Sequence, residues 1–190
     1  MTTSTSRPGH VPAAPRDAPP RELPDGDAFR RAMGRFPTGV AILTQGCGPL
    51  TRAVTVNSVT SVSLDPQLLS VCLGRDSSVL GPLLGAGYFT VNLLSGAQRE
   101  SCARFAGRAR PTGAEAHEEL GGRRGDNGCL VVEGALAALE CRVTGTVSAG
   151  DHVIVLGGVE ALHHGPAEAE PLVFYGGGYR RLAPPAPAPH

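Results

Sequence analysis

The chain has 190 residues, of which 41% are hydrophobic and 4% aromatic, and its 17 basic residues, all arginine, balance 17 acidic ones. Zero net charge argues against a nucleic-acid-binding protein, which needs excess basic residues to neutralise phosphates. Without lysine the chain cannot form a Schiff base or a Walker-type phosphate contact. No apolar run approaches the roughly 20 residues of a membrane-spanning helix.

Prolines mark the two ends of the predicted domain. Ten of the 17 prolines fall in residues 1–24 and 183–190, and neither segment has apolar periodicity. We therefore predict disordered tails at 1–24 and 183–190 around one folded domain at 25–182. The first six residues are polar and no apolar stretch follows them, so no signal peptide is expected. Five cysteines without a C-x-x-C pair indicate reduced thiols and a cytoplasmic location.

The first half of the domain predicts one helix followed by strands. Apolar side chains at positions 29, 33 and 36 share one helical face, and the helix should begin at an Asp27 N-cap and end at Pro37. Runs rich in apolar and β-branched residues then predict strands at 40–44, 52–64 and 68–73. The turn-forming residues 46–49 make the first two of these strands a hairpin.

The second half alternates short helices with strands. Ser77 and Ser78 are candidate caps of a helix through Leu84, and Ser95 with Gln98 forms a capping box for a helix that should stop at Gly107. Residues 107–128 are rich in glycine and charge and lack periodicity, which predicts a long loop. The remaining predicted strands are 88–94, 131–147, 152–162, 172–175 and 179–182. Many short strands with few helices favour a closed or nearly closed barrel.

Polar residues in the strand at 52–64 form the first candidate site. Because strand side chains alternate, Thr55, Asn57, Val59, Ser61 and Ser63 should share one face. Such a row of hydroxyls and one amide could bind a planar heterocycle or a phosphate. By spacing alone, the solvated face of an ordinary edge strand is the commoner case.

Two further stretches carry polar groups at turns. Arg75 to Ser78 precedes a helix and is either an anion site or simple helix capping. The turn Gly150-Asp151-His152 offers an imidazole for an anionic group or a ring. We interpret the pair His163-His164 as surface residues rather than metal ligands. Gly176 to Gly178 lacks the register of a dinucleotide-binding fingerprint.

Taken together, these segments resemble the flavin reductase family, the FMN-binding split-barrel reductases of two-component monooxygenases. The resemblance covers residues 28–182 and depends on the number, order and spacing of eight blocks: Phe29 to Val40, Thr55 to Pro66, Val71 to Ser78, Phe89 to Leu93, Arg104 to Gly107, Gly134 to Cys141, Gly150 to His152 and Pro171 to Tyr175. It implies an all-β-dominated fold, a six-stranded antiparallel Greek-key split barrel with short flanking helices. It also implies a homodimer with flavin near the subunit interface.

The resemblance also implies the residues that bind FMN or FAD and NADH or NADPH. Those expected along the flavin are Thr38, Gly39, Asn57, Ser58, Ser61, Val62, Ser63, Arg75, Ser77, Ser78, Asn92, Arg104 and Phe105. Those expected along the nicotinamide nucleotide are Asp151, His152, Tyr175 and Tyr179. No side chain is expected to be catalytic, because hydride passes directly between the two cofactors.

The implied function is an NAD(P)H-dependent flavin reductase that supplies reduced flavin to a partner monooxygenase. Two alternatives stay open: a flavin-binding accessory protein without turnover, and a split-barrel flavoenzyme that acts directly on an organic substrate. The residues leave open FMN against FAD and NADH against NADPH. Neither a metal nor a nucleic acid nor a membrane partner is expected.

Overall fold

The computed structural model describes residues 23–182. The predicted tails lie outside this range except for Leu23 and Pro24, which are exposed. The helices are α1 (Gly26–Met33), α2 (Leu80–Ala86), α3 (Arg99–Ala106) and α4 (Gly113–Leu120), with single 3-10 turns at Gly48–Leu50 and Gly96–Gln98. The strands are β1 (Thr38–Gly39), β2 (Ala41–Gln45), β3 (Arg52–Val56), β4 (Thr60–Leu64), β5 (Gln67–Gly74), β6 (Tyr88–Leu93), β7 (Gly122–Arg124), β8 (Leu130–Val132), β9 (Ala137–Ala149), β10 (His152–His164), β11 (Val173–Tyr175) and β12 (Gly178–Arg180).

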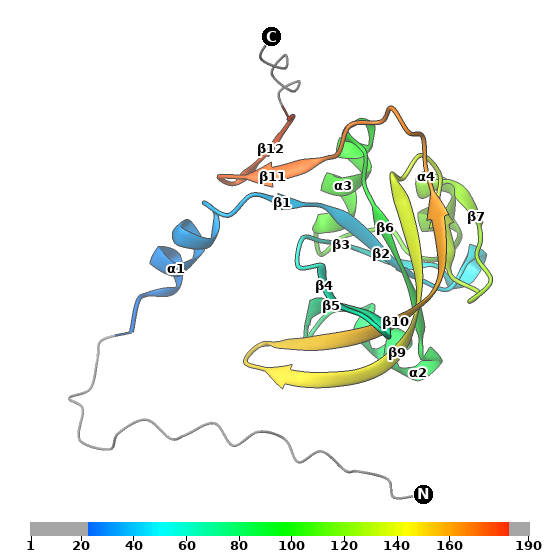
Figure 1. Ribbon diagram of the computed structural model, residues 1–190, viewed down its shortest axis with the longest axis horizontal. Coiled ribbons are helices and arrows are strands. Elements are labelled where there is room, and N and C mark those ends of the chain that lie inside the picture. Colours follow the sequence, from blue (N-terminus) through cyan, green and yellow to red (C-terminus); the bar gives the residue numbers. More distant parts are fainter. Residues whose placement is uncertain (1–22, 183–190) are drawn as a thin grey trace, which may run out of the picture.

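One antiparallel sheet of seven strands forms the body of the molecule (Figure 1). Its strand order is β3-β2-β6-β9-β10-β5-β4, and the long hairpin of β9 and β10 curves across its middle. The strand-dominated, antiparallel class is as predicted, but this sheet has seven strands where six were expected. Two small sheets accompany it: β1-β11-β12 and β7-β8. The C-terminal strands β11 and β12 therefore pair with β1 and each other rather than closing the main sheet.

Two clusters of buried apolar side chains pack against the curved sheet and form the core. The first includes Val71, Phe89 and Val155, and short helix α2 adds Leu83 to it. The second lies between the sheet and helices α3 and α4, and it includes Ile42 and Phe105. The alternating burial of β5 shows that its buried residues come from one face of the strand. Among residues 23–182, no helix has the length and hydropathy needed to cross a bilayer.

Helix α1 stands apart from the sheet (Figure 1). Its N-cap is Asp25, whose carboxylate accepts a hydrogen bond from the Ala28 N–H, and not Asp27 as predicted. The predicted apolar face is present, but it is unburied: Phe29, Met33 and Phe36 are 63%, 52% and 66% exposed. Nothing within the described chain covers this face.

Three predicted elements differ in the structure. The strand predicted at 131–147 is divided between β8 and β9, which belong to separate sheets. The predicted loop 107–128 contains helix α4 and strand β7, because Ala116 and Leu120 pack into the second apolar cluster and fix a helix there. The predicted strand 52–64 is two strands, β3 and β4, that pair with different neighbours. The capping box of Ser95 and Gln98 and the end of α3 at Gly107 are confirmed.

Candidate functional site

A cavity of about 710 Å³ lies at one end of the sheet, within the range of roughly 300–1,000 Å³ typical of ligand pockets. Three turns surround it: the connection from β3 to β4, the turn after β5, and the β9–β10 hairpin turn. The segment after α3 adds a fourth side. The cavity gathers seven of the predicted site residues: Asn57, Ser58, Arg75, Ser77, Ser78, Asp151 and His152.

Ser58 explains why the predicted long strand breaks at this cavity. Its hydroxyl accepts a hydrogen bond from the Cys72 N–H at 3.0 Å and donates one to the Cys72 carbonyl at 3.2 Å. A side chain thereby takes the place of a backbone partner for β5, and the ladder is interrupted at residues 57–59. Asn57 is left exposed at the cavity. The expected single row of hydroxyls does not exist, since the Thr55 hydroxyl donates to the Cys102 carbonyl instead.

The turn after β5 presents two serine hydroxyls. Ser77 N–H donates to the Gly74 carbonyl, which closes the turn, and helix α2 begins only at Leu80. Neither serine caps α2 through its side chain, which corrects the capping interpretation. The hydroxyls of Ser77 and Ser78 are therefore free of a helix-capping role, and both line the cavity.

Arg110 is the site residue that the sequence did not reveal. Its Nη2 contacts the Ser78 hydroxyl at 3.1 Å and the Ser77 hydroxyl at 3.4 Å, and its Nη1 donates to the Gly107 carbonyl. Its Nε is buried without a hydrogen-bond partner among the described residues. Burial lowers the pKa of the Arg110 guanidinium from its ordinary value. A guanidinium and two hydroxyls in one place suit a phosphate, whose oxygens accept charge-assisted hydrogen bonds.

The β9–β10 turn places an imidazole across the cavity. His152 Nδ1 lies 2.8 Å from the Asp151 carboxylate, and this hydrogen bond lowers the pKa of Asp151. Because Nδ1 faces the carboxylate, Nε2 is the ring nitrogen available to a ligand. The Arg75 N–H donates to the Asp151 carbonyl at 3.0 Å, so this turn and the serine turn are joined directly.

Two predicted flavin residues lie in the core instead. Asn92 is fully buried: its amide donates to the Ile42 carbonyl and the Thr44 hydroxyl, and its carbonyl accepts from the Val132 N–H. Phe105 is fully buried in the second apolar cluster. Neither side chain lines the cavity, because both are buried in the core. Sequence alone does not distinguish a buried amide from one that faces a ligand.

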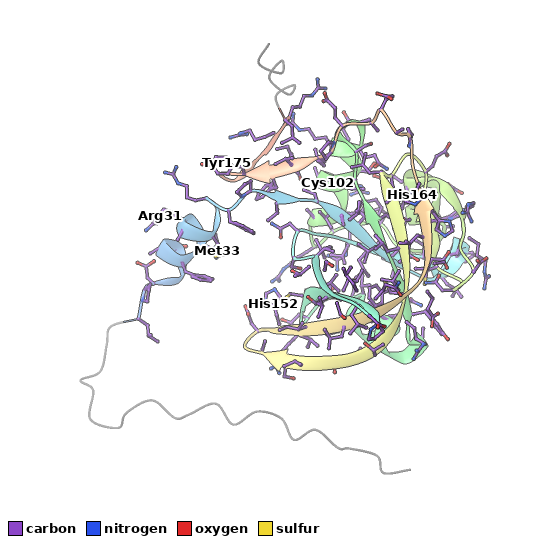
Figure 2. The ribbon with its side chains drawn as sticks, viewed as in Figure 1. Arg31, Met33, Cys102, His152, His164 and Tyr175 are labelled. Atoms are coloured by element: carbon purple, nitrogen blue, oxygen red, sulfur yellow. The ribbon has the colours of Figure 1, made fainter. Side chains whose placement is uncertain are left out.

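The other predicted residues also lie outside this cavity. Arg104 is exposed and pairs with Glu115 and Glu119 of α4. Thr38 and Gly39 form β1, whereas Ser61, Val62 and Ser63 lie on β4. Tyr175 and Tyr179 belong to the hairpin of β11 and β12. Figure 2 shows Tyr175 well separated from His152.

Each tyrosine has its own surroundings. Tyr175 lines a separate cavity of about 540 Å³ with Arg30, Arg31 and Arg35. Tyr179 packs edge-on against Phe174 and accepts a hydrogen bond from the Cys102 thiol at 3.1 Å. Burial, followed by that contact, raises the pKa of Tyr179 to about 12. Within one chain, these two tyrosines are therefore not brought to His152.

The cavity suits a phosphorylated planar ligand with a second ligand beside it. Arg110, Ser77 and Ser78 together offer a guanidinium and two hydroxyls to an anion. Asn57 and the backbone of residues 54–58 offer polar contacts for the edge of a ring. Apart from Asp151 with His152, the described lining holds no paired acid and base.

Known proteins match this chain over most of its length. A family model described as "Flavin reductase like domain" matches residues 33–183. An NADH-dependent FMN reductase, AsuE2, from Streptomyces nodosus subsp. asukaensis is 43% identical over 97% of this chain and 100% of its own length. An NADH-dependent FAD reductase from Streptomyces globisporus is 38% identical over 91% of this chain and 96% of its own. The crystal structure of BorF, the flavin reductase component of a bacterial two-component tryptophan halogenase, superposes with a TM-score of 0.78 at 35% identity, over 85% of this chain and 100% of BorF.

Proposed function

The chain belongs to the flavin reductase family, and we propose that it oxidises NADH to reduce FMN or FAD, which it then releases to a partner monooxygenase. The observation that carries this proposal is the cavity in which an anion subsite and an accessible imidazole face one another. The similarity to NADH-dependent FMN and FAD reductases supports the choice of cofactors.

In this proposal the flavin phosphate binds at Arg110, Ser77 and Ser78. Arg110 supplies the positive charge, and the two hydroxyls orient the phosphate oxygens. Asn57 and the broken strand at Ser58 then lie where polar backbone and side-chain groups can hold the ring edge. When bound, the flavin accepts hydride and the nicotinamide donates it.

His152 holds the nicotinamide nucleotide in this proposal. Its Nε2 is free to donate to a phosphate or ribose oxygen, because Asp151 occupies Nδ1. The chain's task is to bind and orient two cofactors so that their reacting atoms meet at near-attack distance. That task needs no catalytic acid or base.

We further infer that the protein is a homodimer. The apolar face formed by Phe29, Met33 and Phe36 is more than half exposed. Val62 and Leu64 on β4 are also exposed. A contiguous apolar face on a helix that stands apart from its own domain is typical of an interaction site. Light scattering should therefore give twice the chain mass, and Phe29→Glu together with Met33→Glu should give one chain mass. A dimer that survives both charges would contradict this assignment.

We also propose a cytoplasmic location, which cysteine chemistry supports. All five cysteines are free thiols, and three of them are buried. Free thiols persist in a reducing compartment, and intracellular NADH is available there.

The experiment that tests the function is NADH oxidation by the purified chain with and without FMN, FAD or riboflavin. Turnover that requires added flavin would support a reductase that releases its product. Flavin binding without turnover would support the accessory-protein alternative. Retained flavin, with kinetics that saturate in an organic acceptor, would support direct action on an organic substrate.

A further inference from the structure

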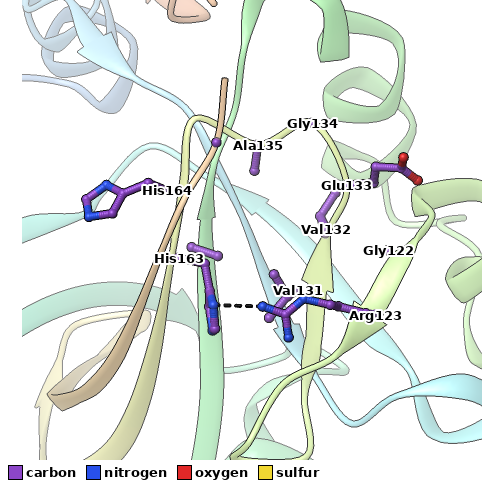
Figure 3. Close-up of a pocket in the computed structure, with 11 residues that line it drawn as sticks. Gly122, Arg123, Val131, Val132, Glu133, Gly134, Ala135, His163 and His164 are labelled. Carbon is purple, nitrogen blue, oxygen red and sulfur yellow. Dashed lines mark hydrogen bonds between the residues drawn. The ribbon is translucent and has the colours of Figure 1, made fainter. Parts of the chain in front are cut away.

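A second cavity, of about 430 Å³, lies at the opposite end of β10 from the flavin cavity (Figure 3). His152 and His163 lie near the two ends of this strand, and eleven residues of extended chain place them on the order of 30 Å apart. The second cavity therefore takes no part in hydride transfer. The lining residues that matter are Arg123, Val132, Ala135, Ala138, His163 and His164.

A buried carboxylate, that of Glu140, contacts the cavity-lining residue His163. Glu140 is 1% exposed, and it accepts hydrogen bonds from the Asp126 N–H, the Asn127 N–H and His163 Nε2, the last at 2.6 Å. Burial raises the pKa of Glu140, but these hydrogen bonds outweigh burial and leave the pKa below its ordinary value. His163 is thus anchored to an ionised group and is not the free surface residue that the sequence predicted.

The other ring nitrogen of His163, Nδ1, contacts Arg123. Nδ1 lies 2.8 Å from Arg123 Nη2, the contact drawn as a dashed line in Figure 3. Since Nε2–H donates to Glu140, a neutral ring accepts from Arg123 through Nδ1. Among residues 23–182, Arg123 forms no ion pair with a carboxylate, and the Glu133 side chain points away from it in Figure 3. The His163 ring therefore fixes the Arg123 guanidinium at the cavity without a direct carboxylate partner among the described residues.

We propose that this cavity binds a small organic molecule through a phosphate group. The phosphate oxygens accept from the Arg123 guanidinium, which His163 Nδ1 positions at the cavity. Glu140 fixes the orientation of the His163 ring, because it accepts a hydrogen bond from Nε2. The cavity is larger than a phosphate group, and Val132, Ala135 and Ala138 supply apolar walls for the organic part.

The charges around His163 come from four elements. Glu140 faces it from β9 and Arg123 from β7, while His164 follows it on β10 and Glu133 lies on the segment after β8. Only Glu140 and Arg123 contact the ring.

The test is calorimetric titration of the full chain with phenyl phosphate and with inorganic phosphate, with one equivalent of FMN present to fill the flavin cavity. Phenyl phosphate should bind saturably and several-fold more tightly than inorganic phosphate. Arg123→Gln should weaken its binding at least about tenfold, because a charge-assisted hydrogen bond is lost. The matched control is Arg124→Gln, the next residue on β7, which does not line the cavity and should leave binding unchanged.

A second variant tests the proposal independently in case Arg123→Gln does not fold. His163→Gln keeps a donor for Glu140 but removes the ring nitrogen that positions Arg123, so it should weaken phenyl phosphate binding. Absence of saturable binding by the parent chain would overturn the proposal. So would equal weakening by Arg123→Gln and Arg124→Gln, or equal affinity for phenyl phosphate and inorganic phosphate.

Discussion

Replacing Arg110 with glutamine tests the flavin phosphate site. Glutamine retains a donor for the hydroxyls of Ser77 and Ser78 but removes the positive charge. A charge-assisted hydrogen bond contributes about 1.5–3 kcal/mol, which corresponds to about a 10- to 150-fold change in Kd. Arg110 already contacts both hydroxyls through Nη2, so its guanidinium is held where the phosphate is expected.

The assay compares flavins that differ only in the phosphate. Kd is measured by flavin fluorescence and KM by NADH oxidation, for FMN and for riboflavin. Arg110→Gln should raise the Kd for FMN about 10- to 150-fold. It should raise the Kd for riboflavin by less than about twofold, since riboflavin has no phosphate. Arg142→Gln is the matched control, because Arg142 is an exposed arginine paired with Glu160 outside the cavity. Equal weakening of both flavins would refute the phosphate assignment and assign Arg110 to loop structure.

Three other substitutions test separate parts of the structure. His152→Ala should raise the KM for NADH at least about tenfold and that for FMN by less than about twofold, because only the nicotinamide contact is lost; equal effects on both would contradict its role. Glu140→Gln should lower stability to urea at pH 7, and the loss should shrink below about pH 4, because a carboxyl with a lowered pKa stabilises the fold above its unfolded pKa and loses that contribution as pH falls; a pH-independent loss would contradict the ionised contacts. Gly157→Ala should cost about 1–3 kcal/mol of unfolding free energy, because an added Cβ would lie 2.6 Å from Phe89 Cζ. Gly145→Ala is its control, with a nearest contact at an ordinary 3.6 Å, and equal costs would contradict the packing argument.

Local signals in the sequence predicted much of the fold. The capping box at Ser95 and the stop at Gly107 depend on neighbours within a few residues, and both were correct. Helix α4 was missed because its stability comes from Ala116 and Leu120 meeting a core built from distant strands. The break between β3 and β4 was missed for a similar reason, since the Ser58 hydroxyl finds Cys72 only in the folded sheet.

The candidate site also combines residues with local sequence signals and residues that only the fold brings together. The predicted site residues on turns, Ser77, Ser78 and His152, all lie at the cavity, because turn chemistry is local and the resemblance covered them. Arg110 lies in a segment without periodicity, and only the fold brings it to the serines. Asn92 lies in a buried hydrogen-bond network outside the cavity, and a polar residue on a strand gives the same sequence signal in either place.

The hydrogen bond between the Arg75 N–H and the Asp151 carbonyl has a thermodynamic consequence. It joins the turn assigned to flavin phosphate with the turn assigned to the nicotinamide nucleotide, so a ligand that orders one turn restrains the other. Linkage requires that this coupling be reciprocal. If FMN tightens NADH binding by a given factor, NADH tightens FMN binding by the same factor.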